Sequence, residues 1–232
     1  MKIHKVTNIE QFVTKILPKQ PQNNKSIVES IIKNVQKNGD SSIKKYEKKF
    51  TGAKLSSLRV SKSEIKNAYS KISKNELSAL RLAKDRVEKT EFSIKNIFKD
   101  KKINHDGIKI LKKFIPIQST GCYIPGGLAR YPSSVIMSVV PAKVAGVKRI
   151  VVVSPPNSNG KIDPLTIVAA DICGATEIYK TGGVQSIAAL SYGTKSILKV
   201  DKIVGPGGAF VTLAKSLVND NTGIDMLAGP TE

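Results

Sequence analysis

Glycine-rich turns mark three places where this chain is able to hold a phosphate group. They are Gly126-Gly127, Gly182-Gly183 and the run from Gly205 to Gly208, and the last two directly precede an expected helix. Backbone N–H groups at a helix N-terminus, together with the helix dipole, bind anions and suit a pyrophosphate. A plain tight turn explains each of them equally well, but the occurrence of all three in one half of the chain favours a nucleotide.

None of the turns completes a standard nucleotide-binding fingerprint. The run that starts at Gly205 has the GxG beginning of a dinucleotide motif, but Phe210 stands where the third Gly belongs. No Lys-Ser or Lys-Thr pair directly follows any of the turns, which excludes a P-loop. Nucleotide binding therefore rests on the joint occurrence of the turns.

Two polar side chains beside these turns are candidates for specificity. Tyr123 is able to stack on a ring or to hydrogen-bond it, and Gln185 stands at the start of a helix, where its amide can read a base or a ribose. Each also has a structural explanation: a half-buried core aromatic for Tyr123, and a polar residue at a helix start for Gln185. From the residues alone, the structural explanation is slightly favoured for both.

The metal-binding and nucleophilic residue types are sparse. His4 and His105 are the only histidines, and both lie in polar, Lys-rich surroundings. Cys122 and Cys173 form no CxxC pair and have no nearby histidine, so we interpret both as buried small hydrophobic residues. A complete His-rich zinc site therefore cannot be built from this chain alone.

Positive charge is concentrated in the first half. Residues 1–113 hold 28 basic and 11 acidic residues, whereas residues 114–232 hold 10 and 7. Of the 38 basic residues, 33 are Lys, while phosphate and base recognition favours the Arg fork. Basic residues are not interleaved with aromatics in the RNA-binding manner. We therefore predict a solvated Lys-rich surface and no nucleic-acid partner.

The chain has no membrane or export signal that we recognise. Its 232 residues contain no apolar run of about 18 residues, and its N-terminus lacks an apolar signal-peptide core. A cytoplasmic protein without a membrane partner is expected.

Helical spacing dominates the first half. Residues 1–25 are interpreted as an N-terminal arm. Three capping boxes, each a Ser followed three residues later by a Glu, predict helix N-termini at Ser26, Ser61 and Ser73. Gly39 is expected to end the first helix, and a second, capped by Asp40, carries Ile43, Tyr46 and Phe50 toward the core. Residues 107–117 have a β-like pattern.

The sequence pattern changes at residues 121–127, a Gly-rich stretch that separates the helical half from a half in which strands and helices alternate. β-branched or apolar runs at 148–154, 176–179 and 200–204 predict strands, and they alternate with helices at 135–145, 163–173, 184–192 and 209–219. Such alternation with short Gly-rich turns indicates βαβ crossovers and a mostly parallel sheet. The expected fold class is α/β, with a Lys-rich helical N-terminal part and a Rossmann-like sheet domain.

Four ordered motifs resemble histidinol dehydrogenase. They are GCYIPGG at 121–127, GGVQSIAAL at 182–190, VDKIVGPG at 200–207 and DMLAGPTE at 225–232. The helical half fits as well, through Asn38-Gly39-Asp40 followed by Tyr46 and Phe50. The resemblance implies a cytoplasmic, homodimeric enzyme that oxidises L-histidinol to L-histidine through the aldehyde, with zinc and two NAD, as the last step of histidine biosynthesis.

The resemblance also assigns site residues. The NAD-contacting Tyr, Gln and Asn of the family fall on Tyr123, Gln185 and Gly208, and the third is a departure because Gly208 has no side chain. The family's substrate-contacting Ser, in its AGPSE motif, falls on Thr231, which keeps the hydroxyl. Either backbone contacts suffice at Gly208, or the affinity or orientation of the cofactor differs.

The family's zinc ligands and its catalytic Glu-His pair follow the AGPSE motif, so none of them falls on this chain. We therefore interpret the sequence as an N-terminal fragment that is inactive alone, with no catalytic or metal-binding residue of its own. The resemblance implies an incomplete first domain at 26–120 and an NAD-side domain at 121–232. The alternatives are a non-catalytic nucleotide-binding module, or a family member that oxidises another small polar alcohol.

Overall fold

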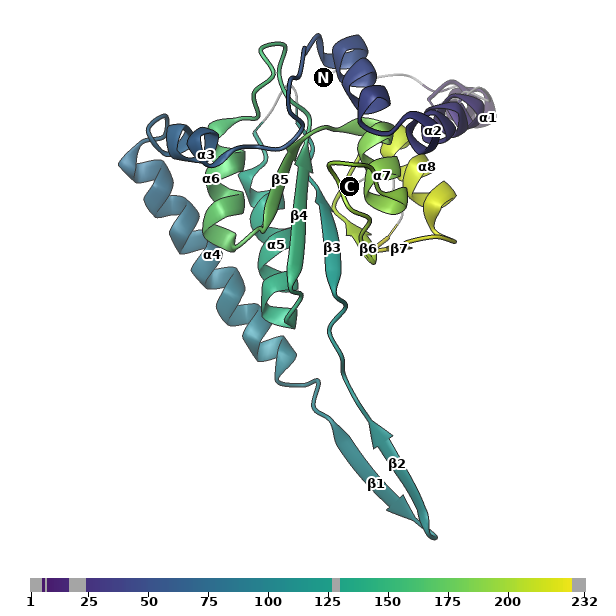
Figure 1. Cartoon of the computed structure of the whole chain (residues 1–232). Helices are drawn as coiled ribbons and strands as arrows, with labels where there is room; N and C mark the ends of the chain where they lie inside the picture. Colours follow the sequence, from purple (N-terminus) through teal and green to yellow (C-terminus); the bar gives the residue numbers. More distant parts are fainter. Residues whose placement is uncertain (1–5, 7, 17–23, 127–129, 227–232) are drawn as a thin grey trace.

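The computed structural model describes residues 6, 8–16, 24–126 and 130–226 of the chain (Figure 1). The helices are α1 (Ile9–Ile16), α2 (Asn24–Thr51), α3 (Lys62–Tyr69), α4 (Lys74–Lys95), α5 (Pro132–Ala145), α6 (Pro164–Cys173), α7 (Gly183–Tyr192) and α8 (Ala209–Val218). The strands are β1 (Lys101–His105), β2 (Ile108–Lys112), β3 (Ser119–Tyr123), β4 (Arg149–Ser154), β5 (Glu177–Lys180), β6 (Lys202–Val204) and β7 (Gly223–Ile224). No helix among these residues combines the length and apolarity that a membrane span requires.

A parallel sheet forms the centre of the molecule. Its strands lie in the order β5-β4-β3-β6-β7, and every neighbouring pair is parallel. The chain runs outward from β3 through β4 to β5, and then α7 returns it to β6 on the other side of β3. The strand order therefore reverses between β3 and β6, and the predicted α/β class is confirmed.

The central strand β3 is an element that the sequence analysis missed. Its Gly121 belongs to the Gly-rich stretch that we interpreted as the boundary between the helical half and the α/β half. All five residues of β3 are nevertheless buried. A Cβ on Gly121 would press against the Leu190 side chain, because α7 packs directly on this strand. Glycine at this position allows close helix–sheet packing and does not form a turn. Because the strand contains this glycine, it lacks the run of apolar residues by which strands were predicted.

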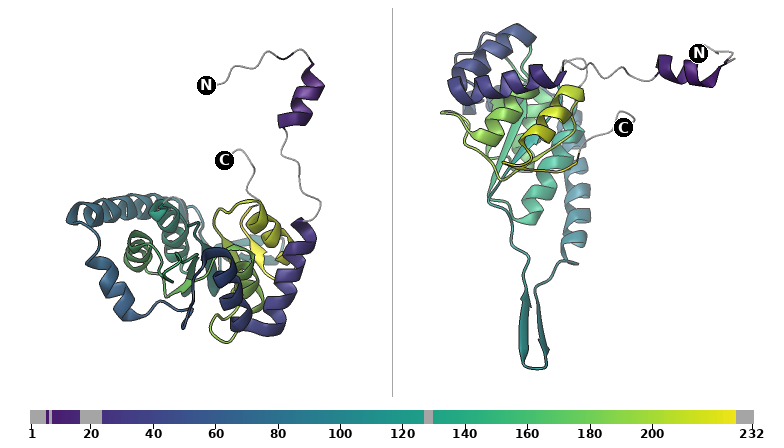
Figure 2. Two further views of the ribbon diagram at one scale, coloured as in Figure 1. Left: turned by 90° about the horizontal axis from the view of Figure 1, so that it is seen from above. Right: turned by 90° about the vertical axis from the view of Figure 1, so that its right-hand side faces the viewer.

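Helices cover both faces of the sheet, and successive strand residues divide between them. Val151 and Val153 of β4 point toward the core formed with α2, α7 and α8. Ile150 and Val152 point toward the core formed with α3, α4, α5 and α6. Figures 1 and 2 show these two groups of helices on opposite sides of the sheet. Both cores contain residues from before and after residue 120, and the domain boundary near that residue stays a prediction.

Two of the three predicted capping boxes are confirmed. The hydroxyl oxygens of Ser61 and Ser73 each accept the backbone N–H of the Glu three residues later. In return, the backbone N–H of each Ser donates to the carboxylate of that Glu. The third is wrong, because α2 already begins at Asn24 and Ser26 lies inside it. The expected break at Gly39 is present as a kink with φ +53° within α2, in the left-handed region that favours glycine.

The inward face of the second half of α2 differs from the prediction. Ile43 is fully buried, but Phe50 is 53% exposed and stacks on the half-buried Tyr46. Glu47 takes the inward position instead and is fully buried. It follows Ile43 by four residues, so both lie on one helical stripe.

A two-stranded hairpin extends from the body of the molecule (Figures 1 and 2). It pairs β1 with β2 in antiparallel register, so the β-like pattern at residues 107–117 accounts only for β2. Asp106 and Gly107 both have positive φ at its tip, as a two-residue turn with φ > 0 at both central positions requires. Every residue of the two strands is exposed, so the hairpin contributes nothing to either core.

Candidate functional site

The reversal of strand order places two loops against each other at the carboxyl edge of the sheet. Tyr123 ends β3, and Gly205 follows β6, the neighbouring strand. Gly205 has φ +113°, and a Cβ at this position would overlap the carbonyl oxygen of Tyr123. Only glycine fits this contact. Ligands of open α/β sheets bind in the crevice at such a point, outside the carboxyl ends of the strands.

Tyr123 is packed into the interior at this edge. Its side chain is 6% exposed and belongs to the core beneath α7. Its hydroxyl oxygen accepts the backbone N–H of Gly183 at 3.4 Å. Burial raises the pKa of Tyr123; the hydrogen bond from Gly183 lowers it, and the nearby Glu47 raises it further. The phenol therefore stays neutral and joins β3 to the first turn of α7.

Gln185 is buried in the same place. It is 2% exposed, and its Nε2 donates to Oε1 of Glu47 at 2.8 Å. Its own Oε1 has no hydrogen-bond partner among the described residues. Gln185 therefore faces Glu47 in this structure rather than open solvent.

Glu47 is the functional candidate that sequence reasoning missed. Its Oε1 accepts from the Thr181 hydroxyl at 2.8 Å, from the Gly182 N–H at 2.9 Å and from Gln185. Burial raises the pKa of this carboxyl group, and the hydrogen bonds from Gly182, Gln185 and Thr181 offset the rise in part. The signal for it in the sequence is the spacing, because Glu47 follows Ile43, a residue expected to point inward, by four positions.

The Gly182-Gly183 turn is therefore closed to an external anion in this structure. Glu47 accepts the Gly182 N–H, and Tyr123 accepts the Gly183 N–H. A buried carboxyl group and a phenol already occupy the donors that we assigned to a phosphate. The interpretation of this turn as an anion site is corrected on that ground.

Gly208 presents the opposite situation at the N-terminus of α8. It is the N-cap residue, it is exposed, and no side chain caps the helix. A Cβ at Gly208 meets no atom within 4 Å, and its φ of −68° suits any residue. The backbone therefore leaves open space where the family pattern carries Asn. Of the two helix N-termini that follow a glycine turn, that of α8 is the one available to a phosphate.

The loop between β6 and α8 is held in place by a buried ion pair that contacts the backbone of Gly205. Lys215 of α8 is 3% exposed and donates to the carbonyl oxygen of Gly205 at 3.1 Å. It also pairs with Asp225, whose second oxygen accepts the Gly205 N–H at 2.7 Å. A cleft of about 670 Å³ lies beside this pair, with walls from α5 and β6. The glycine turn is thus held by the segment that follows β7.

The predicted site residues come together only in part. Tyr123 and Gln185 meet through Gly183 and Glu47, whereas Gly208 lies on the neighbouring loop and takes no part in that network. Gly127 of the first turn and Thr231, the predicted substrate contact, fall outside the described residues.

Zinc does not fit the residues that the structure describes. Across residues 6, 8–16, 24–126 and 130–226, no three His, Cys, Asp or Glu side chains are grouped to hold a metal ion. Burial raises the pKa of both Cys122 and Cys173 to about 12, so neither forms a thiolate ligand at neutral pH. His105 lies in the exposed hairpin, and His4 is outside the described residues.

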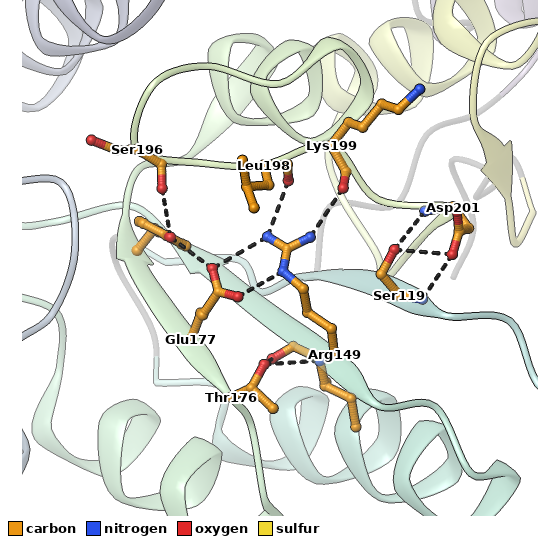
Figure 3. Close-up of polar contacts among 10 residues, drawn as sticks. Ser119, Arg149, Thr176, Glu177, Ser196, Leu198, Lys199 and Asp201 are labelled. Atoms are coloured by element: carbon orange, nitrogen blue, oxygen red, sulfur yellow. Dashed lines mark hydrogen bonds and ion pairs between the residues drawn. The ribbon is translucent and has the colours of Figure 1, made fainter.

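The amino edge of the same sheet carries a different kind of polar network (Figure 3). Arg149, at the start of β4, makes two bonds to Glu177, at the start of β5, with Nε–Oε1 of 2.6 Å. Its remaining N–H groups donate to the carbonyl oxygens of Leu198 and Lys199. Asp201 accepts the backbone N–H and the hydroxyl of Ser119 beside them. This network joins the strand ends and the loop before β6.

The comparisons with known proteins agree on one family. The family model described as histidinol dehydrogenase matches residues 17–232. A histidinol dehydrogenase of Methanococcus maripaludis is 49% identical over 206 residues, which is 88% of this chain and 48% of that protein. The protein of the same name from Methanocaldococcus jannaschii is 42% identical over 234 residues, 100% of this chain and 54% of its own length.

A solved structure agrees as well. The crystal structure of histidinol dehydrogenase from Elizabethkingia anophelis superposes with a TM-score of 0.88 at 34% identity. The match covers 96% of this chain and 52% of that one. The chain therefore spans about half the length of the relatives that it matches.

Proposed function

Because the chain belongs to the histidinol dehydrogenase family, we propose that it forms the NAD-side part of an oxidoreductase of histidine biosynthesis. The whole enzyme oxidises L-histidinol to L-histidine through the aldehyde and depends on zinc. Cytoplasmic residence and a homodimeric full-length enzyme belong to the same proposal.

The observation that carries the proposal is the reversal of strand order between β3 and β6 at the carboxyl edge of the sheet. Tyr123 and Gly205 meet there, and the uncapped N-terminus of α8 begins beside them at Gly208. The space that a Cβ would enter at Gly208 is free, so the backbone N–H groups of this turn can be approached closely. These features suit the pyrophosphate of a dinucleotide.

The residues of this chain bind and orient the cofactor. The first turn of α8 holds the pyrophosphate through its N–H groups and its dipole. Tyr123 and Gln185 form the buried wall of the site beside α7, where the hydroxyl proton of Tyr123 and the second amide N–H of Gln185 remain for a ribose or a ring. NAD held there would supply the hydride acceptor for oxidation of the alcohol carbon.

The chemical step needs groups that this chain does not bring together. Removal of a hydride from an alcohol requires a base for the hydroxyl proton and a means of holding the oxygen. The 232 residues contain two histidines, and the described part holds no metal-ligand cluster. We therefore expect the chain alone to bind NAD without oxidising histidinol.

Calorimetric titration of the 232-residue chain with NAD tests the proposal. Gln185→Ala is expected to weaken binding by about tenfold, because one hydrogen bond and its burial are lost. Gln36→Ala, an exposed position on α2, is the matched control and leaves the affinity unchanged.

Four outcomes separate the alternatives. NAD binding that survives Gln185→Ala contradicts the assigned site. Production of NADH from histidinol by the chain alone contradicts the view that its chemistry needs further residues. NAD binding without any histidinol oxidation in the full-length protein supports a non-catalytic nucleotide-binding module. Oxidation of a different alcohol by the full-length protein identifies another substrate.

A further inference from the structure

Glu47 is a fully buried acidic residue to which the proposed function gives no role. It lies in the second half of α2, and its carboxyl group faces the first turn of α7. Its oxygen Oε1 accepts three hydrogen bonds, from Thr181, Gly182 and Gln185, at 2.8 to 2.9 Å. A side chain with 0% exposure and this many contacts is held in one position.

Two oxygen atoms in this cluster have no hydrogen-bond donor. They are Oε2 of Glu47 and Oε1 of Gln185, and both are buried without a partner among the described residues. An ionised carboxylate and an amide carbonyl are both acceptors, so neither satisfies the other. A buried acceptor without a donor costs about 1–3 kcal/mol, so two of them side by side call for an explanation.

One proton on Glu47 removes both deficits. A neutral carboxylic acid has one O–H donor and one carbonyl acceptor, which matches the N–H donor and carbonyl acceptor of a primary amide. The bond from Gln185 Nε2 to Glu47 Oε1 is already half of such a pair. The second half is a bond from the acid O–H at Oε2 to the amide oxygen of Gln185.

The surroundings favour the neutral acid. Burial is the largest influence on Glu47 and raises its pKa, and no charged side chain contributes to the balance. The titratable side chains on the elements around it include Tyr123 of β3, Tyr179 and Lys180 of β5, Tyr192 of α7, and Lys44 and Lys48 of its own helix. Lys180 is already paired with Glu64 at 2.9 Å. Tyr123 is held neutral by burial, and Lys44 is turned toward the carbonyl oxygen of Ser56. No cation therefore stands ready to stabilise an ionised Glu47.

We propose that Glu47 is a positioning residue for Gln185: as a neutral acid it donates to the amide carbonyl of Gln185 and accepts from its amide N–H. Its carbonyl oxygen also holds Thr181 and the N–H of Gly182, so one group sets the shape of the turn and the direction of the amide. The effect on NAD rests on the proposed function, whereas the protonation state does not.

Carbon-13 NMR of the wild-type chain labelled at its glutamate carboxyl groups tests the protonation state directly. One carboxyl signal is expected to keep the chemical shift of a neutral acid at pH 7, and it should disappear in Glu47→Gln. Glu29→Gln on the exposed face of the same helix is the matched control and should leave that signal in place. A wild-type spectrum in which every glutamate is ionised at pH 7 overturns the proposal, whether or not the variant folds.

NAD titration across pH tests the positioning role. Gln at position 47 reproduces the donor and the acceptor of the neutral acid, so Glu47→Gln is expected to bind NAD as the wild type does at pH 6. The wild-type affinity should fall as the pH rises through the pKa of Glu47, whereas that of the variant should not follow this titration. Glu47→Ala should bind about tenfold more weakly, since the buried donors and acceptors lose their partner.

Equal weakening by Glu47→Gln and Glu47→Ala, each shown to be folded by circular dichroism, overturns the positioning role. If no form of the chain binds NAD, the proposed function fails at this site and the positioning role fails with it. The NMR result then still decides whether Glu47 and Gln185 form the neutral acid–amide pair.

Discussion

The two edges of the parallel sheet use polar groups in opposite ways. At the amino edge, Arg149 and Glu177 satisfy each other through two bonds, and the spare donors of Arg149 reach two backbone carbonyls. At the carboxyl edge, Glu47 and Gln185 each keep one oxygen without a partner in the described structure. The amino edge is joined by a charged pair, whereas the Glu47–Gln185 pair at the carboxyl edge needs a proton to satisfy both of its remaining oxygens.

Glycines with positive φ occur near both edges, but they differ in what they contact. Gly146 and Gly174, before β4 and β5, end the helices α5 and α6. Gly205, after β6, lies so close to the backbone of Tyr123 that a Cβ would overlap it. The network at the amino edge holds strand ends in register, whereas this close contact lies at the edge where ligands of open α/β sheets bind. The same division is known from α/β enzymes in which one edge serves stability and the other function.

The largest effect is expected from Gly205→Ala at the carboxyl edge. The new Cβ overlaps the backbone of Tyr123, and φ of +113° is unfavourable for alanine. We expect a loss of roughly 4 kcal/mol of unfolding free energy or more, measured by urea denaturation. Gly208→Ala in the same turn is the matched control, because its Cβ has free space, and it should cost less than about 1 kcal/mol. Equal losses in the two variants contradict the close packing of β3 on Gly205.

Arg149→Ala is expected to have the next largest effect, at the amino edge. It leaves Glu177, whose side chain is 15% exposed, without its cation, and two carbonyls without donors. A loss of about 3 kcal/mol is expected in chemical denaturation. The folded variant should bind NAD like the wild type, because the site lies at the other edge. A variant that is stable but binds NAD poorly contradicts the separation of the two edges.

The pH dependence of stability should have opposite signs at the two edges. For Glu177, burial raises the pKa, but the bonds from Arg149 and Tyr179 outweigh it and lower the pKa below its ordinary value. Its stabilisation is therefore present above the unfolded pKa and is lost as the pH falls through the folded pKa. For Glu47, burial raises the folded pKa, so its stabilisation is present below the unfolded pKa and is lost as the pH rises through the folded pKa.

Urea denaturation at a series of pH values measures both effects. Relative to wild type, Glu177→Gln should lose most stability near neutral pH and least in acid. Glu47→Gln should come closest to the wild type, or exceed it, as the pH rises. Parallel curves for the two variants contradict the contrast between the edges.

Gly208→Asn is expected to have the smallest effect on stability. Asn is a better N-cap than Gly by a few tenths of a kcal/mol, and the position has room for its side chain. A slight rise in the melting temperature of the chain is therefore expected. If the proposed cofactor site is correct, the same variant binds NAD more tightly than the wild type in calorimetry. Weaker NAD binding indicates that the bare backbone of Gly208 is what the cofactor needs.

The sequence predicted the elements whose boundaries depend on local chemistry. Ser61 and Ser73 cap their helices as expected, because a capping box is complete within four residues. The central strand β3 was missed because the glycine at position 121 is required by packing against Leu190, which is distant in sequence, and not by its local neighbours. Phe50 was expected inside and lies outside, since helical spacing alone does not say where the packed surface ends.

The candidate site was also predictable only in part. Tyr123 and Gln185 were singled out, and the structure joins them through Gly183 and Glu47. The burial of Tyr123 agrees with the core-aromatic explanation that the sequence slightly favoured. The burial of Gln185 was not predictable, because it depends on α2 covering α7, a contact between segments far apart in sequence. Glu47 was missed because a lone acid among lysines normally lies in solvent. Its burial also depends on the packing of α2 on α7.

The packing of α2 on α7 also fixes an order of events during synthesis. The three partners of Glu47 Oε1 lie 134, 135 and 138 residues after it. At about 5–20 residues per second, a ribosome needs roughly ten seconds to make that stretch. Throughout this interval, the apolar stripe of Val28, Ile31 and Val35 lacks α7, the helix on which it packs. A nascent chain that pauses before α7 therefore exposes this stripe to chaperones and to other nascent chains.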